Sequence, residues 1–167
     1  MRILGVDTAL RCTGYGLIDV ENRSYNVVDC GIIKNSLKAS YSNCLFRLSS
    51  GIDQLINEYD PDLASIEGAF YLKNAKTAML LGMARGAVVA SLSKANITIY
   101  EYAPTRAKQA ITGFGRAGKE QVAQVLGGML SLDVSTIPDD ATDALSLAVC
   151  HAVIADNQNG IHLKDPI

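Results

Sequence analysis

The distribution of apolar and polar positions along the chain predicts an α/β protein. Short apolar runs bounded by turn residues predict strands over residues 2–7, 14–20, 25–33, 62–67 and 96–102. Apolar residues at helical spacing predict helices over residues 40–58, 75–94, 105–111, 119–130 and 140–155. Three locally joined strands, then a strand–helix–strand unit and further helices, predict a five-stranded mixed sheet with helices on its faces.

The order of these elements predicts a single domain over residues 1–156, followed by a flexible polar tail over residues 157–167. The unit from residue 62 to residue 102 is expected to form a right-handed parallel crossover. Gly14 and Gly16 lie near the start of the second strand, where their lack of a side chain predicts close approach of another part of the backbone.

Composition is that of an ordinary globular protein, with 49% hydrophobic and 19% charged residues. The four cysteines form no Cys-x-x-Cys pair, which favours a reduced, cytoplasmic protein with free thiols. The first residues lack the apolar segment of a signal peptide. The longest apolar run, residues 78–92, is interrupted by Arg85, so we expect no membrane-spanning helix and no membrane partner.

Charge is unevenly distributed along the chain, although the net charge is only −2. Eight basic residues and a single acid, Glu101, lie between Gly68 and Lys119, which gives this span a charge of +7 and the remainder −9. Basic side chains gathered in this way can form a surface that binds a phosphate backbone. The alternative is that they scatter over different faces once the chain folds.

Four acidic residues lie where predicted elements begin or end. Asp7 closes the first strand and Glu67 closes the fourth, so both carboxylates would project from the same carboxyl edge if these strands are parallel neighbours. Asp140 and Asp143 are three residues apart on the last helix and point to one side. Clustered carboxylates need a counter-charge, and oxygen ligands suit Mg²⁺ or Mn²⁺.

Helix capping offers a simpler explanation for part of this acidic cluster. Aspartates at a helix start can bond free N–H groups and favour the helix dipole by roughly 0.3–1 kcal/mol each. Spacing alone leaves open whether Asp139 or Asp140 faces a metal. Because Asp139 follows Pro138, we expect Asp139 to be the cap and Asp140 the ligand.

Several motifs, taken in order, resemble the RuvC family of Holliday junction resolvases in the RNase H-like superfamily. They are GVD at 5–7, TGYG at 13–16, IEGAF at 66–70, LKNAKTAMLLGMARG at 72–86, YAPTRAKQAITGFGRAGKEQV at 102–122 and DATDALSLAVCH at 140–151. The resemblance covers about residues 1–155. It implies an RNase H-like fold and a nuclease that resolves four-way DNA junctions by paired symmetric nicks.

The resemblance implies roles for individual residues of this chain. The family's four metal-binding acids match Asp7, Glu67, Asp140 and Asp143, with Asp7 bridging two Mg²⁺ ions. Lys119 would stabilise negative charge at the scissile phosphate. DNA-binding side chains would be Phe70, Lys73, Lys76, Arg85, Arg106, Lys108, Arg116 and Lys119. An ordinary core position for Phe70, and solvated helix faces for Lys108 and Lys119, are the alternatives.

Two positions depart from the family pattern. Thr8 and Ala9 follow Asp7, where the family has Pro-Gly or Pro-Ser, which affects the loop but leaves the carboxylate. Met83 replaces a glutamine in the family's LGQARG, which bears on the dimer or DNA surface.

Partners also follow from the resemblance. Two symmetric cuts imply a C2 homodimer, and the family implies the RuvA–RuvB branch-migration complex as a further partner. The small residues of the helix at 75–94, including Gly82 and Gly86, suit close approach of a second copy. Packing against the chain's own sheet is the alternative.

Three other classes of protein compete with a junction resolvase. One is an RNase H-like nuclease that cuts RNA/DNA hybrids. An actin-like ATPase or sugar kinase needs a second phosphate loop in a repeated domain, for which 167 residues leave no room. A junction-binding protein without catalysis would have no use for four clustered acids.

Overall fold

The computed structural model describes residues 1–68, 74–156 and 165–167. Its five strands are β1 (Arg2–Asp7), β2 (Cys12–Glu21), β3 (Ser24–Lys34), β4 (Leu63–Glu67) and β5 (Thr98–Tyr102). They form one sheet in the order β3-β2-β1-β4-β5. β1, β4 and β5 are mutually parallel, while β2 is antiparallel to both of its neighbours. The predicted five-stranded mixed sheet is confirmed.

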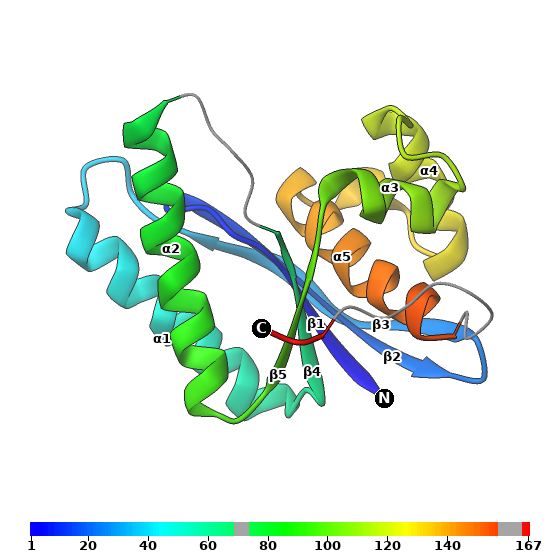
Figure 1. Ribbon diagram of the computed structural model, residues 1–167, viewed down its shortest axis with the longest axis horizontal. Coiled ribbons are helices and arrows are strands. Elements are labelled where there is room, and N and C mark those ends of the chain that lie inside the picture. Colours follow the sequence, from blue (N-terminus) through cyan, green and yellow to red (C-terminus); the bar gives the residue numbers. More distant parts are fainter. Residues whose placement is uncertain (69–73, 157–164) are drawn as a thin grey trace.

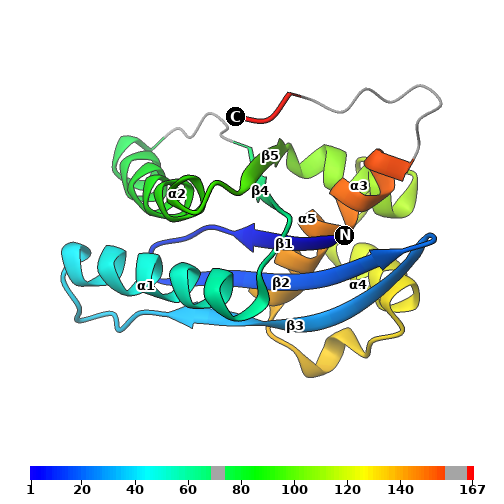
Figure 2. The same cartoon turned by 90° about the horizontal axis from the view of Figure 1, so that it is seen from below.

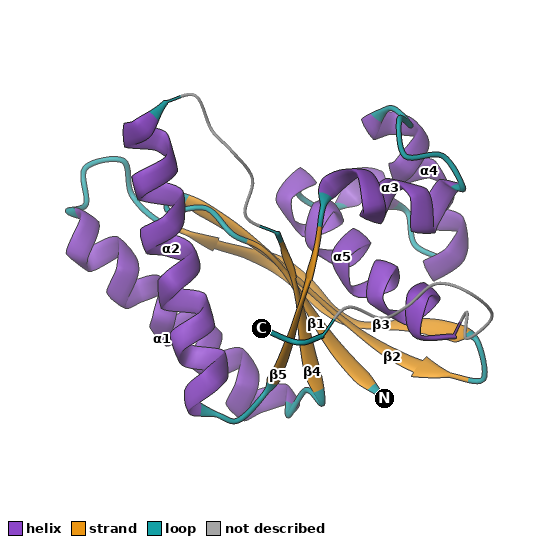
Figure 3. Ribbon diagram, in the orientation of Figure 1, coloured by secondary structure: helices purple, strands orange, loops and turns teal. Residues whose placement is uncertain are grey.

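Helices cover both faces of the sheet, as Figures 1 and 2 show. They are α1 (Tyr41–Tyr59), α2 (Ala75–Lys94), α3 (Pro104–Thr112), α4 (Lys119–Leu130) and α5 (Asp139–Asp156), with a short 3₁₀ turn η1 at Val134–Thr136. Figure 3 shows the strands as one twisted layer, with α1 and α2 on one side and α3, α4 and α5 on the other. This arrangement is that of the RNase H-like fold.

Two main hydrophobic clusters hold these layers together. One packs α1 and α2 against Leu4, Val6 and Ile66 of the central strands. The other packs α4 and α5 against Ile3 and Ile18 on the opposite face. Because successive residues of a strand point to opposite faces, β1 contributes to both clusters and forms the centre of the molecule.

The apolar spacing of α1 explains its position. Cys44, Leu48, Ile52 and Leu55 are buried along one stripe of the helix. The side chain of Ser40 accepts a hydrogen bond from the main chain of Asn43 at the start of α1. The helix ends at Tyr59, and the next residue, Asp60, has a left-handed backbone (φ 46°) before Pro61, which cannot continue the helix.

The position of α5 is fixed by two glycines beneath it. A Cβ at Gly14 would lie 1.8 Å from the main-chain oxygen of Asp140, and a Cβ at Gly5 would lie 2.0 Å from that of Ala144. Any other residue would push the helix away from the sheet. The close backbone approach predicted at Gly14 is therefore confirmed, and it places the acidic end of α5 over the end of β1.

The outer face of α2 is apolar and exposed. Met79 and Met83 have exposed fractions of 56% and 36%, and a Cβ at Gly82 or Gly86 would meet no described atom within 4 Å. These two glycines therefore do not pack on the chain's own sheet. By length and composition alone α2 could cross a membrane, with a mean hydropathy of 1.2 and 22% of that stretch buried. One helix that passes on length and composition is weak evidence for a membrane span, so the expectation of no membrane-spanning helix stays a prediction.

Other differences from the predicted elements are local. β5 begins at Thr98 rather than at residue 96, and the 3₁₀ turn at Val134–Thr136 was not predicted. α5 begins at Asp139, so Asp139 lies within the first turn and the predicted capping position is wrong. Most of the predicted tail, residues 157–164, lies outside the described residues. Ile167 donates its main-chain N–H to the Ile99 oxygen at 3.0 Å, so the last residues lie beside β5.

Candidate metal centre

The carboxyl ends of two central strands bring Asp7 and Glu67 together. β1 and β4 are parallel neighbours, with Val6 opposite Ile66, so the next residue on each strand is one of these acids. Both side chains point to the face that α5 covers. The expected shared edge is therefore present, at the position where α/β proteins commonly bind ligands.

A pocket of about 340 Å³ opens at this edge. Asp7, Glu67 and Asp143 contribute three carboxylates from β1, β4 and α5. The remaining lining residues come from α3, α4 and α5; they are Pro104, Ala107, Lys108, Lys119, Val122, Ser146 and Leu147. The pocket thus combines acids and lysines from parts of the chain that are far apart in sequence.

The negative charge in this pocket is under-compensated. Burial, together with the charges of Glu67, Asp143 and Asp140, raises the pKa of Asp7 to about 7, while the charge of Lys119 opposes this rise. Burial and the charge of Asp143 also raise the pKa of Glu67. Close acids that resist ionising together are typical of a site that receives a cation.

Lys119, the first residue of α4, supplies the local counter-charge. Its Nζ atom lies 3.2 Å from Asp143 and 3.3 Å from Asp139. Partial burial lowers the pKa of Lys119, but its hydrogen bonds with Asp143 and Asp139 outweigh that effect and raise it. With 58% of its side chain exposed, Lys119 can leave these partners when another cation or a phosphate group arrives.

Asp139 and Asp140 occupy different positions around the pocket. The Asp139 side chain is 85% exposed and contacts Lys119. Asp140 does not line the pocket, but its charge raises the pKa of Asp7 and, together with the larger effect of burial, that of Cys12. Asp140 is therefore close to both β1 and β2.

The donor set suits a hard divalent cation. All four acids supply oxygen ligands, which Mg²⁺ and Mn²⁺ prefer. Within residues 1–68, 74–156 and 165–167, no three acid, histidine or cysteine side chains are already arranged around one ion. Holding one ion would therefore require movement of side chains among these acids.

The basic residues predicted to bind DNA do not share one position. Lys108 and Lys119 line the pocket, while Lys76 and Arg116 are exposed on α2 and on the α3–α4 loop. Burial raises the pKa of Tyr102 and of Cys150, and Arg106 lies close enough to both for its charge to oppose that rise. Phe70 and Lys73 lie outside the described residues. The basic span is therefore divided, and among its described residues only Lys108 and Lys119 line the acidic pocket.

Arg85 has partners inside the protein instead. Only 17% of its side chain is exposed, and its guanidinium forms an ion pair with Glu101 on β5. It also donates a hydrogen bond to the main-chain oxygen of Glu67 at 2.5 Å. We therefore remove Arg85 from the predicted DNA-binding surface.

Two polar residues at the site were missed by sequence reasoning. Ser146 lines the pocket one helical turn after Asp143, and the spacing of three residues could have identified it. Thr8 follows Asp7 and is 8% exposed, and its hydroxyl is the one buried side-chain polar atom of the described residues that lacks a hydrogen bond. The family's proline at this position would carry no such hydroxyl.

Comparison with known proteins identifies the family to which this chain is similar. Residues 3–151 match the family described as crossover junction endodeoxyribonuclease RuvC. The protein of that name from Caldicellulosiruptor saccharolyticus is 41% identical and covers 100% of both chains. That from Alkaliphilus metalliredigens is 42% identical over 91% of this chain and 93% of its own.

A solved structure extends this agreement to three dimensions. T. thermophilus RuvC, in complex with a Holliday junction substrate, superposes with a TM-score of 0.90 at 26% identity. The match covers 100% of this chain and 99% of that one. Sequence and fold agree over the full length, and this chain belongs to the RuvC family of crossover junction endodeoxyribonucleases.

Proposed function

We propose that this protein cuts four-way DNA junctions with paired symmetric nicks, in homologous recombination and DNA repair. The observation that carries the proposal is the meeting of Asp7, Glu67 and Asp143 with Lys119 in one open pocket. Relatives of the same length are crossover junction endodeoxyribonucleases, and a RuvC of the same fold has been solved with a Holliday junction.

Membership of the RuvC family implies that the protein uses a divalent metal ion. It also implies that the protein acts on DNA and works outside membranes. We assign Mg²⁺, with Mn²⁺ as a substitute, to Asp7, Glu67, Asp140 and Asp143. Two ions held there would neutralise the scissile phosphate and activate the attacking water. Lys119 would stabilise charge that develops on the phosphate, and Lys108 would hold the neighbouring backbone.

Substitutions of the three aspartates at the start of α5 test the metal assignment. Asp140→Asn and Asp143→Asn should each reduce cleavage of a labelled synthetic junction by more than about 100-fold, because losing a ligand exceeds the 10–100-fold effect of losing a residue behind one. Asp139→Asn should retain most activity, since it loses one exposed contact with Lys119. Denaturing gels of all four strands would measure both the rate and the symmetry of the nicks.

The same assay separates the competing functions. If Asp139→Asn is inactive and Asp140→Asn is active, the metal-binding set is wrong by one residue. Cleavage of an RNA/DNA hybrid in preference to the junction would favour a different RNase H-like nuclease. A wild-type protein that binds the junction but never nicks it, in Mg²⁺ or Mn²⁺, would be a binding protein.

The exposed face of α2 supports a homodimer. Met79 and Met83 are apolar and exposed, and Gly82 and Gly86 leave room for the backbone of a second helix. A C2 dimer would present two pockets to the two symmetric strands of a junction. We place this dimer, with the RuvA–RuvB branch-migration complex as a further partner, in the cytoplasm.

Adding bulk at Gly82 should weaken this dimer. Gly82→Leu is expected to shift the protein from dimer to monomer in sedimentation velocity and to lower junction cleavage, because the leucine would hold the two helices apart. Gly128→Leu on α4 is the matched control, since Gly128 is also helical and has no described atom within 4 Å of an added Cβ. Dimers of unchanged stability in Gly82→Leu would rule out α2 as the interface.

A further inference from the structure

Arg85 joins three elements at the end of β4. It lies on α2, pairs with Glu101 on β5, and donates to the main-chain oxygen of Glu67. Its two terminal nitrogens serve different partners: NH2 contacts the Glu101 carboxylate and NH1 contacts the carbonyl. This planar fork is a geometry that arginine provides and lysine does not.

The carbonyl that Arg85 contacts lies past the end of the β1–β4 pairing, although β5 still pairs with β4 at Glu67. Pairing between β1 and β4 ends at Ile66, so the main-chain oxygen of Glu67 lies beyond the ladder. The N–H of the same peptide, from Gly68, donates to the Tyr102 oxygen at 2.9 Å. The peptide that follows Glu67 is therefore held at both ends, by α2 through its oxygen and by β5 through its nitrogen.

Arg85 and the Glu67 carboxylate lie on opposite faces of the sheet. Glu101 is two residues after Ile99 on β5, so the side chains of Ile99 and Glu101 point to the same face. Ile99 packs with α2, so Glu101 also points to the α2 face. The Glu67 carboxylate lines the pocket under α5. Arg85 can therefore act on Glu67 through the backbone, without entering the pocket or contacting DNA there.

We propose that Arg85, held by Glu101, is a positioning residue that fixes the Glu67 carboxylate for metal binding. This inference rests on the proposed function, in which Glu67 is a metal ligand. Fixing the peptide after Glu67 sets the backbone rotation at Glu67 and so the direction of its side chain. A residue outside the pocket that orients a metal ligand in this way raises metal affinity, because the ligand side chain then loses less conformational entropy when the metal binds.

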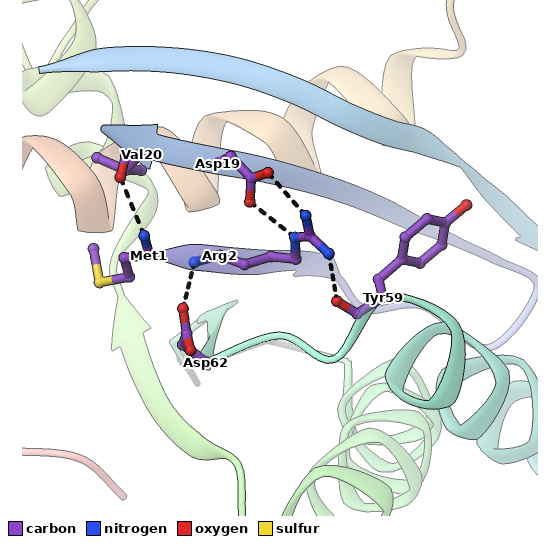
Figure 4. Close-up of polar contacts among 6 residues, drawn as sticks. All are labelled: Met1, Arg2, Asp19, Val20, Tyr59 and Asp62. Atoms are coloured by element: carbon purple, nitrogen blue, oxygen red, sulfur yellow. Dashed lines mark hydrogen bonds and ion pairs between the residues drawn. The ribbon is translucent and has the colours of Figure 1, made fainter. Parts of the chain in front are cut away.

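A second arginine provides the matched control, shown in Figure 4. Arg2 makes a two-pronged contact with Asp19, at 2.8 Å for each nitrogen, and donates to the Tyr59 main-chain oxygen at 2.7 Å. This arrangement resembles that of Arg85 but lies at the start of β1, whereas Asp7 is the last residue of that strand. Replacing Arg2 removes equivalent contacts without touching the metal ligands.

The test compares Arg85→Met, Arg85→Lys, Glu101→Gln and Arg2→Met. Mn²⁺ binding to each DNA-free protein, followed by electron paramagnetic resonance, measures metal affinity directly. We expect affinity to fall by roughly 10-fold in Arg85→Met. Arg85→Lys and Glu101→Gln should show smaller losses in the same direction, because each keeps part of the fork. Arg2→Met should bind Mn²⁺ like the wild type, even where its melting temperature falls.

Cleavage supplies the second readout. The Mg²⁺ concentration for half-maximal cleavage should rise in Arg85→Met by a factor similar to the loss of Mn²⁺ affinity, and excess Mg²⁺ should restore the rate. Junction affinity without metal, and its dependence on salt, should match the wild type. If Arg85 bound a phosphate, affinity would weaken and the slope of log affinity against log salt would fall by about one.

Three outcomes would overturn the inference. Equal Mn²⁺ affinity in Arg85→Met, Arg2→Met and the wild type would leave Arg85 with only a packing role. A weaker junction complex with a changed salt slope would return Arg85 to the DNA surface. If Arg85→Met does not fold, unchanged Mn²⁺ binding in both Arg85→Lys and Glu101→Gln would reject the positioning role of Arg85. A wild type that binds Mn²⁺ but nicks no junction would contradict the proposed function and leave the binding comparison valid.

Discussion

Replacing Asp7 with Asn will abolish junction cleavage while making the metal-free protein more stable. Asp7 lies at the centre of the acidic pocket, next to Glu67 across the β1–β4 pair. An amide in its place cannot supply the charge that two cations need, so we expect no detectable nicks in Mg²⁺ or Mn²⁺. Junction binding in EDTA should persist or strengthen, because one negative charge facing the phosphates is removed.

The gain in stability follows from the raised pKa of Asp7, about 7 against an ordinary 3.8. A folded-state pKa above the unfolded value contributes stability that is fully present below about pH 4 and is lost as the pH rises through 7. At pH 8 the ionised carboxylate therefore opposes folding. Asp7→Asn should raise the free energy of unfolding at that pH by roughly 1–3 kcal/mol.

Urea unfolding in EDTA at pH 5 and pH 8 would test this sign. The advantage of Asp7→Asn over the wild type should be larger at pH 8 than at pH 5. Glu21→Gln, on an exposed residue at the far end of β2, is a control that should show no such dependence. A variant that is less stable than the wild type at pH 8 would contradict the account of the charge in this pocket.

The second large effect is expected from Gly14→Ala. The new Cβ would have to occupy a point 1.8 Å from the main-chain oxygen of Asp140 and 3.0 Å from the nitrogen of Ala141. Neither atom belongs to a flexible side chain, so α5 or β2 must move. We expect a loss of about 3 kcal/mol or more in the free energy of unfolding, and lower cleavage in the protein that remains folded.

Gly128→Ala gives the opposite expectation for the same chemical change. Gly128 lies inside α4 with no described atom within 4 Å of an added Cβ, so alanine should stabilise the helix by about 1 kcal/mol. Urea unfolding of both variants would measure the difference. Equal stabilities would mean that α5 is not seated against the β1–β2 pair as tightly as the structure indicates.

The sequence was sufficient to predict the sheet and its two helical layers because apolar spacing is a local property of the chain. It also predicted that Asp7 and Glu67 share an edge, since parallel neighbours end at the same side. The boundaries that it missed are of another kind. α5 begins at Asp139 rather than after it, a difference of a single residue that apolar spacing cannot resolve.

The role of Arg85 could not be predicted from its place in a basic span. Whether a guanidinium faces solvent or a carbonyl depends on the packing of α2 against β5, which brings Arg85 to Glu101 and to the end of β4. Contacts between residues so far apart in sequence follow from the tertiary structure alone. The same holds for Lys119, whose two aspartate partners come from a different helix.

The uncovered apolar face of α2 has a consequence for how the amount of protein controls cutting. If two copies must associate through Met79, Gly82 and Met83 before both strands are nicked, the concentration of active dimer grows with the square of the monomer concentration. At low copy number most molecules would then stand alone. A junction that binds one copy beside another would raise their effective concentration. Dimers would then form on the junction, and cleavage would begin there.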